Sequence, residues 1–220
     1  ERVMIRIIRD DLKEHIHFKD LKVDWSFKNQ LLAFTLMSFV STVLINFIEL
    51  DVRTVIKDSI NVEEAGYWTA INFISKNYMV FSSGLFTLYV LPRFAAIKTQ
   101  ADFTKEVWHI YKTILPIFGV GMLLIYVFRD VIIRVIYPEF TGMSPLFKWQ
   151  LLGDFIKLMS LVIAHQFLAK RMVKSFIITE LTSLISFYIL AIVLLKTYST
   201  EGVVMAHFFR NIIYFVAILI

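Results

Sequence analysis

The sequence has no cysteine and few charged residues, and these two absences exclude several classes of protein. Without cysteine the chain can form neither disulfides nor thiolate metal sites, and no thiol can act as a nucleophile. Charged residues make up 19% of the 220 residues, whereas an ordinary soluble domain has about 25%. Hydrophobic residues make up 58%, and the mean hydropathy is +0.68. This composition predicts a membrane protein.

Motifs for catalysis and cofactor binding are also lacking. The sequence contains no HExxH pair, no other metal-ligand spacing and no glycine-rich phosphate loop. Strand-like alternation is missing too, so we expect an all-α fold. We therefore predict a protein that is not an enzyme, with no catalytic residue, metal or cofactor. The net charge of +5 indicates membrane topology rather than binding to nucleic acid.

The chain does contain six apolar segments, each close to the roughly 20 residues needed to cross a bilayer. They lie near residues 29–52, 66–91, 107–128, 146–169, 175–196 and 202–220. Pro116, Gly119 and Gly121 predict a kink in the third. We expect a six-helix transmembrane bundle at 29–220, preceded by a basic cytoplasmic segment or linker at 1–28. Because the chain starts without Met and stops inside an apolar run, we expect it to be a fragment.

The links between the segments differ in charge. Those near 93–106 and 170–174 are basic and lie on the same side as the basic first segment if every apolar segment crosses. The positive-inside rule makes that side cytoplasmic. The links near 53–65, 129–145 and 197–201 are richer in acids and should face outward. A short apolar piece at 131–137 cannot span and is expected either at the interface or folded back into the protein.

The most unusual segment is 146–170, where an apolar helix of membrane length carries Gln150, Asp154, Lys157 and His165 within about 80° of arc. A charge at bilayer depth costs about 2.5 to 3.5 kcal/mol, so this stripe should face protein or a solvated cavity. Asp154 and Lys157, at i and i+3, can instead form a structural salt bridge with each other. Both possibilities stay open at this stage.

Similar polar stripes occur on other predicted crossings. The first carries Thr35, Ser38, Thr42, Asn46, Glu49 and Arg53, and the second carries Trp68, Asn72, Lys76, Met79, Ser83 and Thr87. Glu49 and Arg53 have the spacing of an interfacial ion pair, and Lys76 either snorkels or faces a cavity. Glu180 lies on the fifth crossing, and His207, Arg210 and Asn211 cluster on the sixth. The third crossing has no such stripe.

Inward polar stripes with cationic side chains describe a solvated cavity for a polar, anionic cargo, and transport is its simplest use. Six crossings would return the chain to the cytoplasmic side, as in one half of a transporter built from two six-helix repeats. Our hypothesis is that Lys76, Lys157 and Arg210 supply positive potential, while Asp154 and Glu180 set their charge or couple movement to an ion.

The sequence also resembles a known family, the Wzx-type flippases of lipid-linked oligosaccharides in the multidrug/oligosaccharidyl-lipid/polysaccharide exporter superfamily. The resemblance covers nearly all of residues 22 to 216 and matches the family's second half. Its most specific part is Phe147-Lys-Trp-Gln-Leu-Leu-Gly-Asp-Phe-Ile-Lys157. Further matching stretches are Phe34–Met37, Glu64–Trp68, Leu88–Pro92, Leu115–Pro116, Arg129–Asp130, Ala169–Lys170 and Ile178–Glu180.

This resemblance implies twelve helices in two bundles around a cavity that opens alternately to cytoplasm and periplasm, in a bacterial inner membrane. The implied cargo is an undecaprenyl-diphosphate-linked oligosaccharide, with the bilayer, a polysaccharide polymerase and a chain-length regulator as further partners. The residues carried over from it are Trp149, Gln150, Asp154, Lys157, Arg129, Asp130 and Glu180. Lys148 is given no family role.

The predicted site combines both lines of reasoning. Candidates for the cargo cavity are Lys76, Asn72, Trp149, Gln150, Asp154, Lys157, Glu180 and Arg210, and candidates for structure or gating are Glu49, Arg53, Arg129 and Asp130. One alternative is an ion-coupled multidrug exporter, whose site should be dominated by carboxylates and aromatics. Another is a membrane glycosyltransferase or polymerase, which would normally need a large polar loop.

Overall fold

The computed structural model describes residues 28–170 and 172–219, all of whose regular elements are helices, as predicted. The predicted basic segment at 1–28 therefore lies almost wholly outside the described residues. The chain divides into two units, residues 1–36 and 37–220, and the second unit holds every helix except the start of the first. The elements are α2 (Lys28–Ser59), α3 (Val62–Leu85), η3 (Phe86–Val90), α4 (Leu91–Ala96), α5 (Gln100–Thr113), α6 (Leu115–Val127), α7 (Arg129–Ile136), η4 (Thr141–Met143), α8 (Leu146–Ala169) and α9 (Val173–Leu219).

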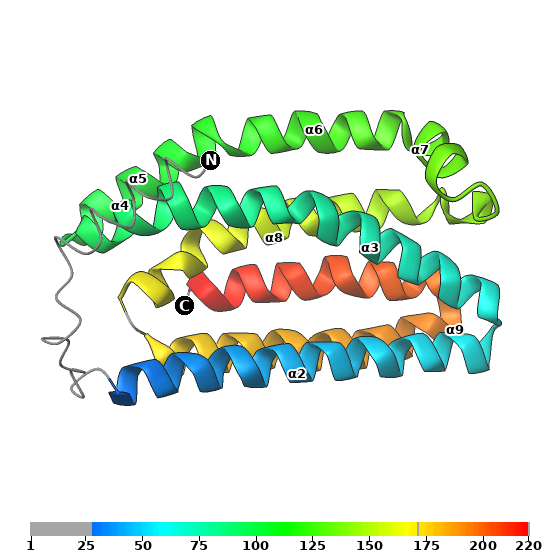
Figure 1. Ribbon diagram of the computed structural model, residues 1–220, viewed down its shortest axis with the longest axis horizontal. Coiled ribbons are helices and arrows are strands. Elements are labelled where there is room, and N and C mark those ends of the chain that lie inside the picture. The colour runs from blue at the N-terminus through cyan, green and yellow to red at the C-terminus, as the bar shows by residue number, and fades with distance from the viewer. Residues whose placement is uncertain (1–27, 171, 220) are drawn as a thin grey trace, which may run out of the picture. The chain divides into compact units, whose positions relative to one another are not determined.

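The helix α8 is the centre of the second unit. It packs most extensively against α9 and also contacts α3, α4, α5 and α6 (Figure 1). Its side chains Phe147 and Leu158 are fully buried, as are Phe86 of η3 and Phe94 of α4. The helix that carries Trp149, Gln150, Asp154 and Lys157, half of the predicted cavity residues, therefore contacts α3, α4, α5, α6 and α9.

The long helix α9 is two antiparallel legs joined at Ser199, whose φ of 56° and ψ of −148° reverse the chain (Figure 1). The legs approach closely at Gly202, where a Cβ would lie only 2.2 Å from the carbonyl oxygen of Leu194. Only glycine fits there. The two legs correspond to the fifth and sixth predicted crossings, with the reversal inside the predicted link at 197–201.

Several links are shorter than predicted. The link expected at 53–65 is reduced to Ile60 and Asn61, because α2 continues to Ser59 and Asn61 caps α3 by accepting a 2.8 Å hydrogen bond from the Glu64 backbone. Thr99 caps α5 in the same way, within the link expected at 93–106. Polar helix ends and capping residues extend these helices beyond their apolar parts, and a hydropathy pattern does not register that extension.

The predicted kink of the third crossing is confirmed. The helix is interrupted at Ile114, between α5 and α6. Pro116 lies in the first turn of α6, where its missing N–H is tolerated. A π-helical turn, η3, precedes Pro92 in the second crossing. The piece expected at the interface or folded back into the protein is the short helix α7, which follows α6 at once.

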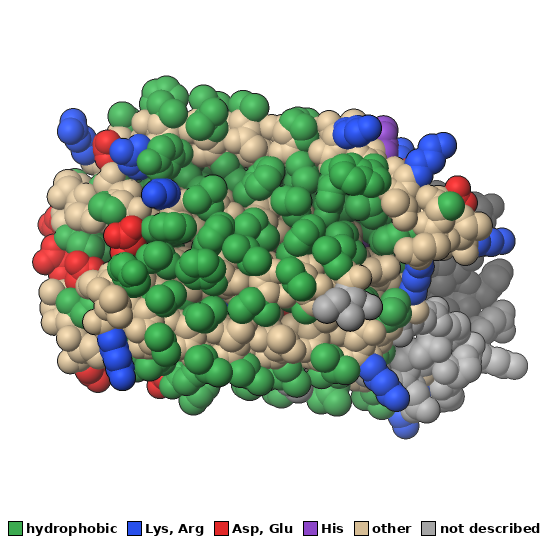
Figure 2. Space-filling view, turned by 180° about the vertical axis from the view of Figure 1, so that it is seen from behind, with side chains coloured by type: hydrophobic (Ala, Val, Ile, Leu, Met, Phe, Trp, Pro, Cys, Tyr) green, Lys and Arg blue, Asp and Glu red, His purple; other side chains and the backbone are tan. Residues whose placement is uncertain are grey.

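The described residues form a multi-pass membrane protein. By length and composition, three stretches are able to cross a bilayer: Val62–Ala96, Gln100–Val127 and Val173–Leu219. The last of these holds both legs of α9. Figure 2 shows a broad hydrophobic belt across the molecule, with most charged side chains toward its two ends. Each predicted crossing falls on a helix, and α2 and α8 are not among the three stretches named.

Candidate functional site

Two of the predicted polar stripes meet in a hollow between α2 and α3. Glu49 and Arg53 come from α2, and Trp68, Asn72 and Lys76 come from α3. The hollow has a volume of about 260 Å³ and is completed by Asn46, Leu50, Thr69 and Phe73. Helical spacing alone had placed these polar residues on one face of each helix, and the fold turns the two faces toward each other.

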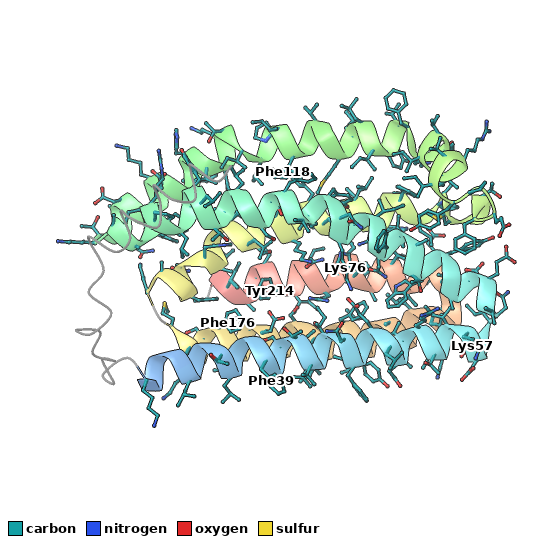
Figure 3. The ribbon with its side chains drawn as sticks, in the orientation of Figure 1. Phe39, Lys57, Lys76, Phe118, Phe176 and Tyr214 are labelled. Atoms are coloured by element: carbon teal, nitrogen blue, oxygen red, sulfur yellow. The ribbon has the colours of Figure 1, made fainter. Side chains whose placement is uncertain are left out.

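An ion pair joins the two walls of this hollow. The Lys76 Nζ lies 2.5 Å from Glu49 Oε2, and the Lys76 side chain is 58% exposed although Figure 3 shows it near the middle of α3. The predicted pairing of Glu49 with Arg53 is wrong, because among the described residues Glu49 forms its ion pair with Lys76. Arg53 makes no ion pair with any described side chain, so its guanidinium is available to an anion in the hollow.

A second polar centre lies around Asp154, which is completely buried. Its carboxylate accepts hydrogen bonds from Ser75 Oγ at 2.5 Å, from the Tyr78 hydroxyl and from Gln150 Nε2 at 3.3 Å. His207 Nε2 lies 2.9 Å from the other carboxylate oxygen. These contacts join α3, α8 and α9 at one point. Charge-assisted hydrogen bonds of this kind offset the cost of burying the carboxylate.

The contact between α8 and α9 depends on a glycine beside Asp154. A Cβ on Gly153 would lie 2.7 Å from Cδ2 of His207 and 3.1 Å from Cα of Phe208. The absence of a side chain lets the second leg of α9 come close enough for His207 to reach Asp154. This close approach was not predicted from the sequence.

Of the two possibilities left open for Asp154 and Lys157, the salt bridge between them is not formed. No ion pair or hydrogen bond of the Lys157 Nζ is found within the described part of the chain, and the side chain is partly exposed. The charges that act on it come from Asp154, Glu180, Glu49 and Arg210. Lys157 thus has no fixed partner among the described residues, and it lies in the electrostatic field of charged side chains from α2, α8 and both legs of α9.

Arg210 and Glu180 lie on the two legs of α9. Arg210 Nε donates a 2.9 Å hydrogen bond to Ser183 Oγ, and its guanidinium lies over the Phe187 ring at 5.4 Å. Arg210, on the second leg, thereby stabilises the packing of the two legs against each other. Glu180 is partly exposed and acts electrostatically on both Lys157 and Arg210.

Trp149 lies apart from the Asp154 centre, at the end of the bundle where the two legs of α9 meet. Its indole Nε1 donates a 2.8 Å hydrogen bond to Glu201 Oε1, and its ring lies 5.5 Å from that of Phe208. The neighbouring Gln150 is buried, and its Oε1 has no hydrogen-bond partner among the described residues. Of the family-matched residues, Gln150, Asp154 and Lys157 are therefore close to the polar centre, and Trp149 is not.

Arg129 and Asp130 form a corner between α6 and α7. Arg129 donates to the Tyr126 carbonyl at 2.8 Å and to Ser144 Oγ at 3.0 Å, and Ser144 donates to Asp130 at 2.7 Å. These bonds tie the start of α7 to the segment before α8. Arg129 and Asp130 were predicted to serve either structure or gating, and this arrangement is compatible with the structural role.

Sequence reasoning missed Ser75 and Tyr78 as partners of Asp154. Both lie on α3 at i and i+3, and Ser82 continues the row one turn further, with Ser75 and Ser82 buried. This second row of polar residues on α3 was the feature of the sequence from which a buried polar contact could have been predicted. Among the described residues there is no group of three or more His, Cys, Asp or Glu side chains that could hold a metal ion.

Comparison with known proteins agrees with the family resemblance. The chain is 28% identical over 198 residues to proteins named lipid III flippase from Escherichia coli (strain K12) and from Shigella flexneri. The match covers 89% of this chain and 48% of each relative, so the chain spans about half the length of the curated relatives it matches. No protein-family model and no solved structure matches it. The chain is thus a membrane protein similar to one half of a lipid III flippase, which confirms the resemblance read from the sequence.

Proposed function

We propose that this chain is the second half of a flippase that moves undecaprenyl-diphosphate-linked oligosaccharides from the cytoplasmic to the periplasmic leaflet of a bacterial inner membrane. The single observation that carries the proposal is the likeness to lipid III flippases over 89% of the chain. In this proposal residues 29–220 supply six of twelve helices, and the cavity between the two halves opens alternately to each side. Residues 1–28 are the cytoplasmic linker. The partners of the flippase are a polysaccharide polymerase and a chain-length regulator.

The hollow between α2 and α3 is the proposed contact for the polar part of the cargo. Arg53 and Lys76 are suited to the diphosphate, since charge-assisted hydrogen bonds replace its lost hydration. Asn72 offers its amide to sugar hydroxyls, and the buried Trp68 contributes an aromatic side chain to the wall of the hollow. In this proposal Glu49 holds Lys76 while the site is empty and gives it up to the phosphate, which competes for the same ammonium.

The experiment replaces Arg53 and Lys76, singly, by Ala in the full-length protein and measures delivery of lipid-linked oligosaccharide to the periplasmic leaflet. We expect each change to reduce delivery by about tenfold, because a hydrogen bond to a charged group contributes about 1.5 to 3 kcal/mol. The matched control is Lys57→Ala. Lys57 lies one turn beyond Arg53 on α2, is exposed and does not line the hollow.

Normal delivery by both variants, at normal protein levels, would remove the hollow from the cargo path. A drug-export assay distinguishes the alternative from the multidrug branch. The proposal expects the wild-type full-length protein to confer no resistance to small cationic drugs.

A further inference from the structure

A groove separate from the polar site runs between α6 and α8. It has a volume of about 450 Å³, and its lining includes Gly119, Leu123, Tyr126, Lys148, Leu152 and Phe155. Lys148 is the charged residue among these side chains, and the others are apolar or aromatic. None of the lining residues belongs to the hollow between α2 and α3 or to the Asp154 centre.

The groove has a polar end and an apolar end. The antiparallel course of α6 and α8 places Tyr126 and Lys148 at one end and Gly119 and Phe155 at the other (Figure 1). A Cβ on Gly119 would lie 3.4 Å from the Phe155 ring, in van der Waals contact with it. Phe155 lies seven positions after Lys148, which is about 10 Å along a helix.

The wall that α6 contributes is suited to hydrocarbon. Leu123, which is 60% exposed, and Met122 line the groove from this side, and α6 has no charged residue. Residues of this kind on a membrane-spanning helix face lipid tails. A water-soluble ligand would gain nothing there, whereas an alkyl chain would fill the groove.

Lys148 supplies a positive charge at the polar end. Its side chain is exposed, and its Nζ lies over the Trp149 ring at 4.9 Å. It forms no ion pair within the described residues. Arg129 adds a second cation near the polar end of the groove, where its guanidinium stacks on the Tyr126 ring at 4.5 Å. Its hydrogen bonds hold the corner between α6 and α7. An apolar groove with a cationic mouth is complementary to a lipid with an anionic headgroup.

We propose that this groove is a binding site for an anionic phospholipid of the surrounding bilayer, with an acyl chain between α6 and α8 and the headgroup phosphate at Lys148. The occupant is a resident lipid rather than the transported one, because no residue of the polar stripe of α8 lines the groove and the groove shares no lining residue with the hollow between α2 and α3. The site is therefore independent of the identity of the cargo.

The test uses the full-length protein in nanodiscs that contain a phosphatidylglycerol with a photoreactive group on its acyl chain. Labelled peptides are mapped by mass spectrometry, and phosphatidylcholine with the same photoreactive chain is the zwitterionic comparison. We expect labelling of residues 117–126 and 148–155 to be about fivefold higher with phosphatidylglycerol, the preference that one lysine gives for an anionic lipid.

Three variants make the test specific. Lys148→Ala should reduce the labelling to the phosphatidylcholine level, Lys148→Arg should keep it, and Leu123→Trp should reduce labelling by both lipids by filling the groove. Lys112→Ala is the control, since Lys112 is an exposed lysine at the end of α5 outside the groove. It should leave the labelling unchanged.

Equal labelling by the two lipids, or a preference that survives Lys148→Ala, would overturn the proposal. So would absence of labelling, which is the result expected if another part of the protein covers the groove. Displacement of the phosphatidylglycerol probe by a polyprenyl-diphosphate lipid would assign the groove to the cargo and overturn it as well. Thermal unfolding of each variant, measured in parallel, shows that the fold is retained.

Discussion

His207 on the second leg of α9 lies 2.9 Å from a carboxylate oxygen of Asp154 on α8, 53 positions earlier in the sequence. The same carboxylate accepts hydrogen bonds from α3 through Ser75 and Tyr78. One buried side chain thus joins three helices that a membrane would otherwise allow to separate, since lipid tails do not drive apolar helices together.

Removing this carboxylate should destabilise the bundle. Asp154→Ala leaves Ser75, Tyr78, Gln150 and His207 without the carboxylate that they contact, and a buried polar group without a hydrogen-bond partner costs about 1 to 3 kcal/mol. We expect a marked fall in the midpoint of thermal unfolding of the full-length protein in detergent. Asp58→Ala, at an exposed position near the end of α2, is the control and should shift the midpoint little. An unchanged midpoint for Asp154→Ala would show that the three helices do not depend on it.

The close approach of α8 and α9 gives a second prediction. Gly153→Val should lower the unfolding midpoint, because its Cβ would meet the His207 ring and the Phe208 backbone at distances that force the helices apart. Overpacking of this kind costs about 1 to 3 kcal/mol. Gly121→Val is the matched control, since a Cβ on Gly121 has no heavy atom within 4 Å. Equal effects of the two changes would contradict the packing described.

The reversal in α9 predicts a stabilising substitution. Ser199 adopts a backbone conformation that glycine occupies far more readily than any other residue. Ser199→Gly should therefore stabilise the protein by about 1 kcal/mol, measured by equilibrium unfolding in a denaturing detergent. Thr197→Gly, two residues earlier in helical backbone, should destabilise it. A destabilised Ser199→Gly variant would mean that the turn differs from the one described.

The hydrogen bond between Trp149 and Glu201 is open to a double-mutant cycle. Trp149→Phe removes the donor and keeps the aromatic contact with Phe208, while Glu201→Ala removes the acceptor. We expect the two effects on unfolding free energy to be non-additive by about 1 kcal/mol. Strict additivity would show that the two side chains do not interact in the membrane.

Lys157 provides a functional prediction. Because it has no fixed partner among the described residues and is surrounded by charges from three helices, we expect Lys157→Ala to lower delivery of lipid-linked oligosaccharide without lowering the unfolding midpoint. Lys157→Arg should retain more delivery than the alanine variant, since it keeps the charge. Normal delivery by Lys157→Ala at normal protein level would remove Lys157 from the mechanism.

Much of the candidate site was predictable, because a polar residue inside an apolar helix is conspicuous and helical spacing assigns it to a face. That reasoning located the walls of the hollow, among them Glu49, Asn72 and Lys76, and singled out Asp154. It also misassigned the partner of Glu49 and left that of Asp154 open, because spacing of three or four residues along one helix suggests a local pair. In the structure Glu49 reaches across to Lys76 on α3, and Asp154 reaches Ser75, Tyr78 and His207 on two other helices.

The sequence by itself determined that this is an all-α membrane protein with apolar segments of crossing length, because hydropathy, periodicity and proline positions are local properties. It also determined the family likeness through the run from Phe147 to Lys157. Only the tertiary structure decided which polar groups meet, since that depends on how closely helices approach. The absence of a side chain at Gly153 allows α9 to pack closely against α8, and His207 therefore reaches Asp154. Asp154 is thus occupied by residues of other helices, and Lys157 has no fixed partner among the described residues.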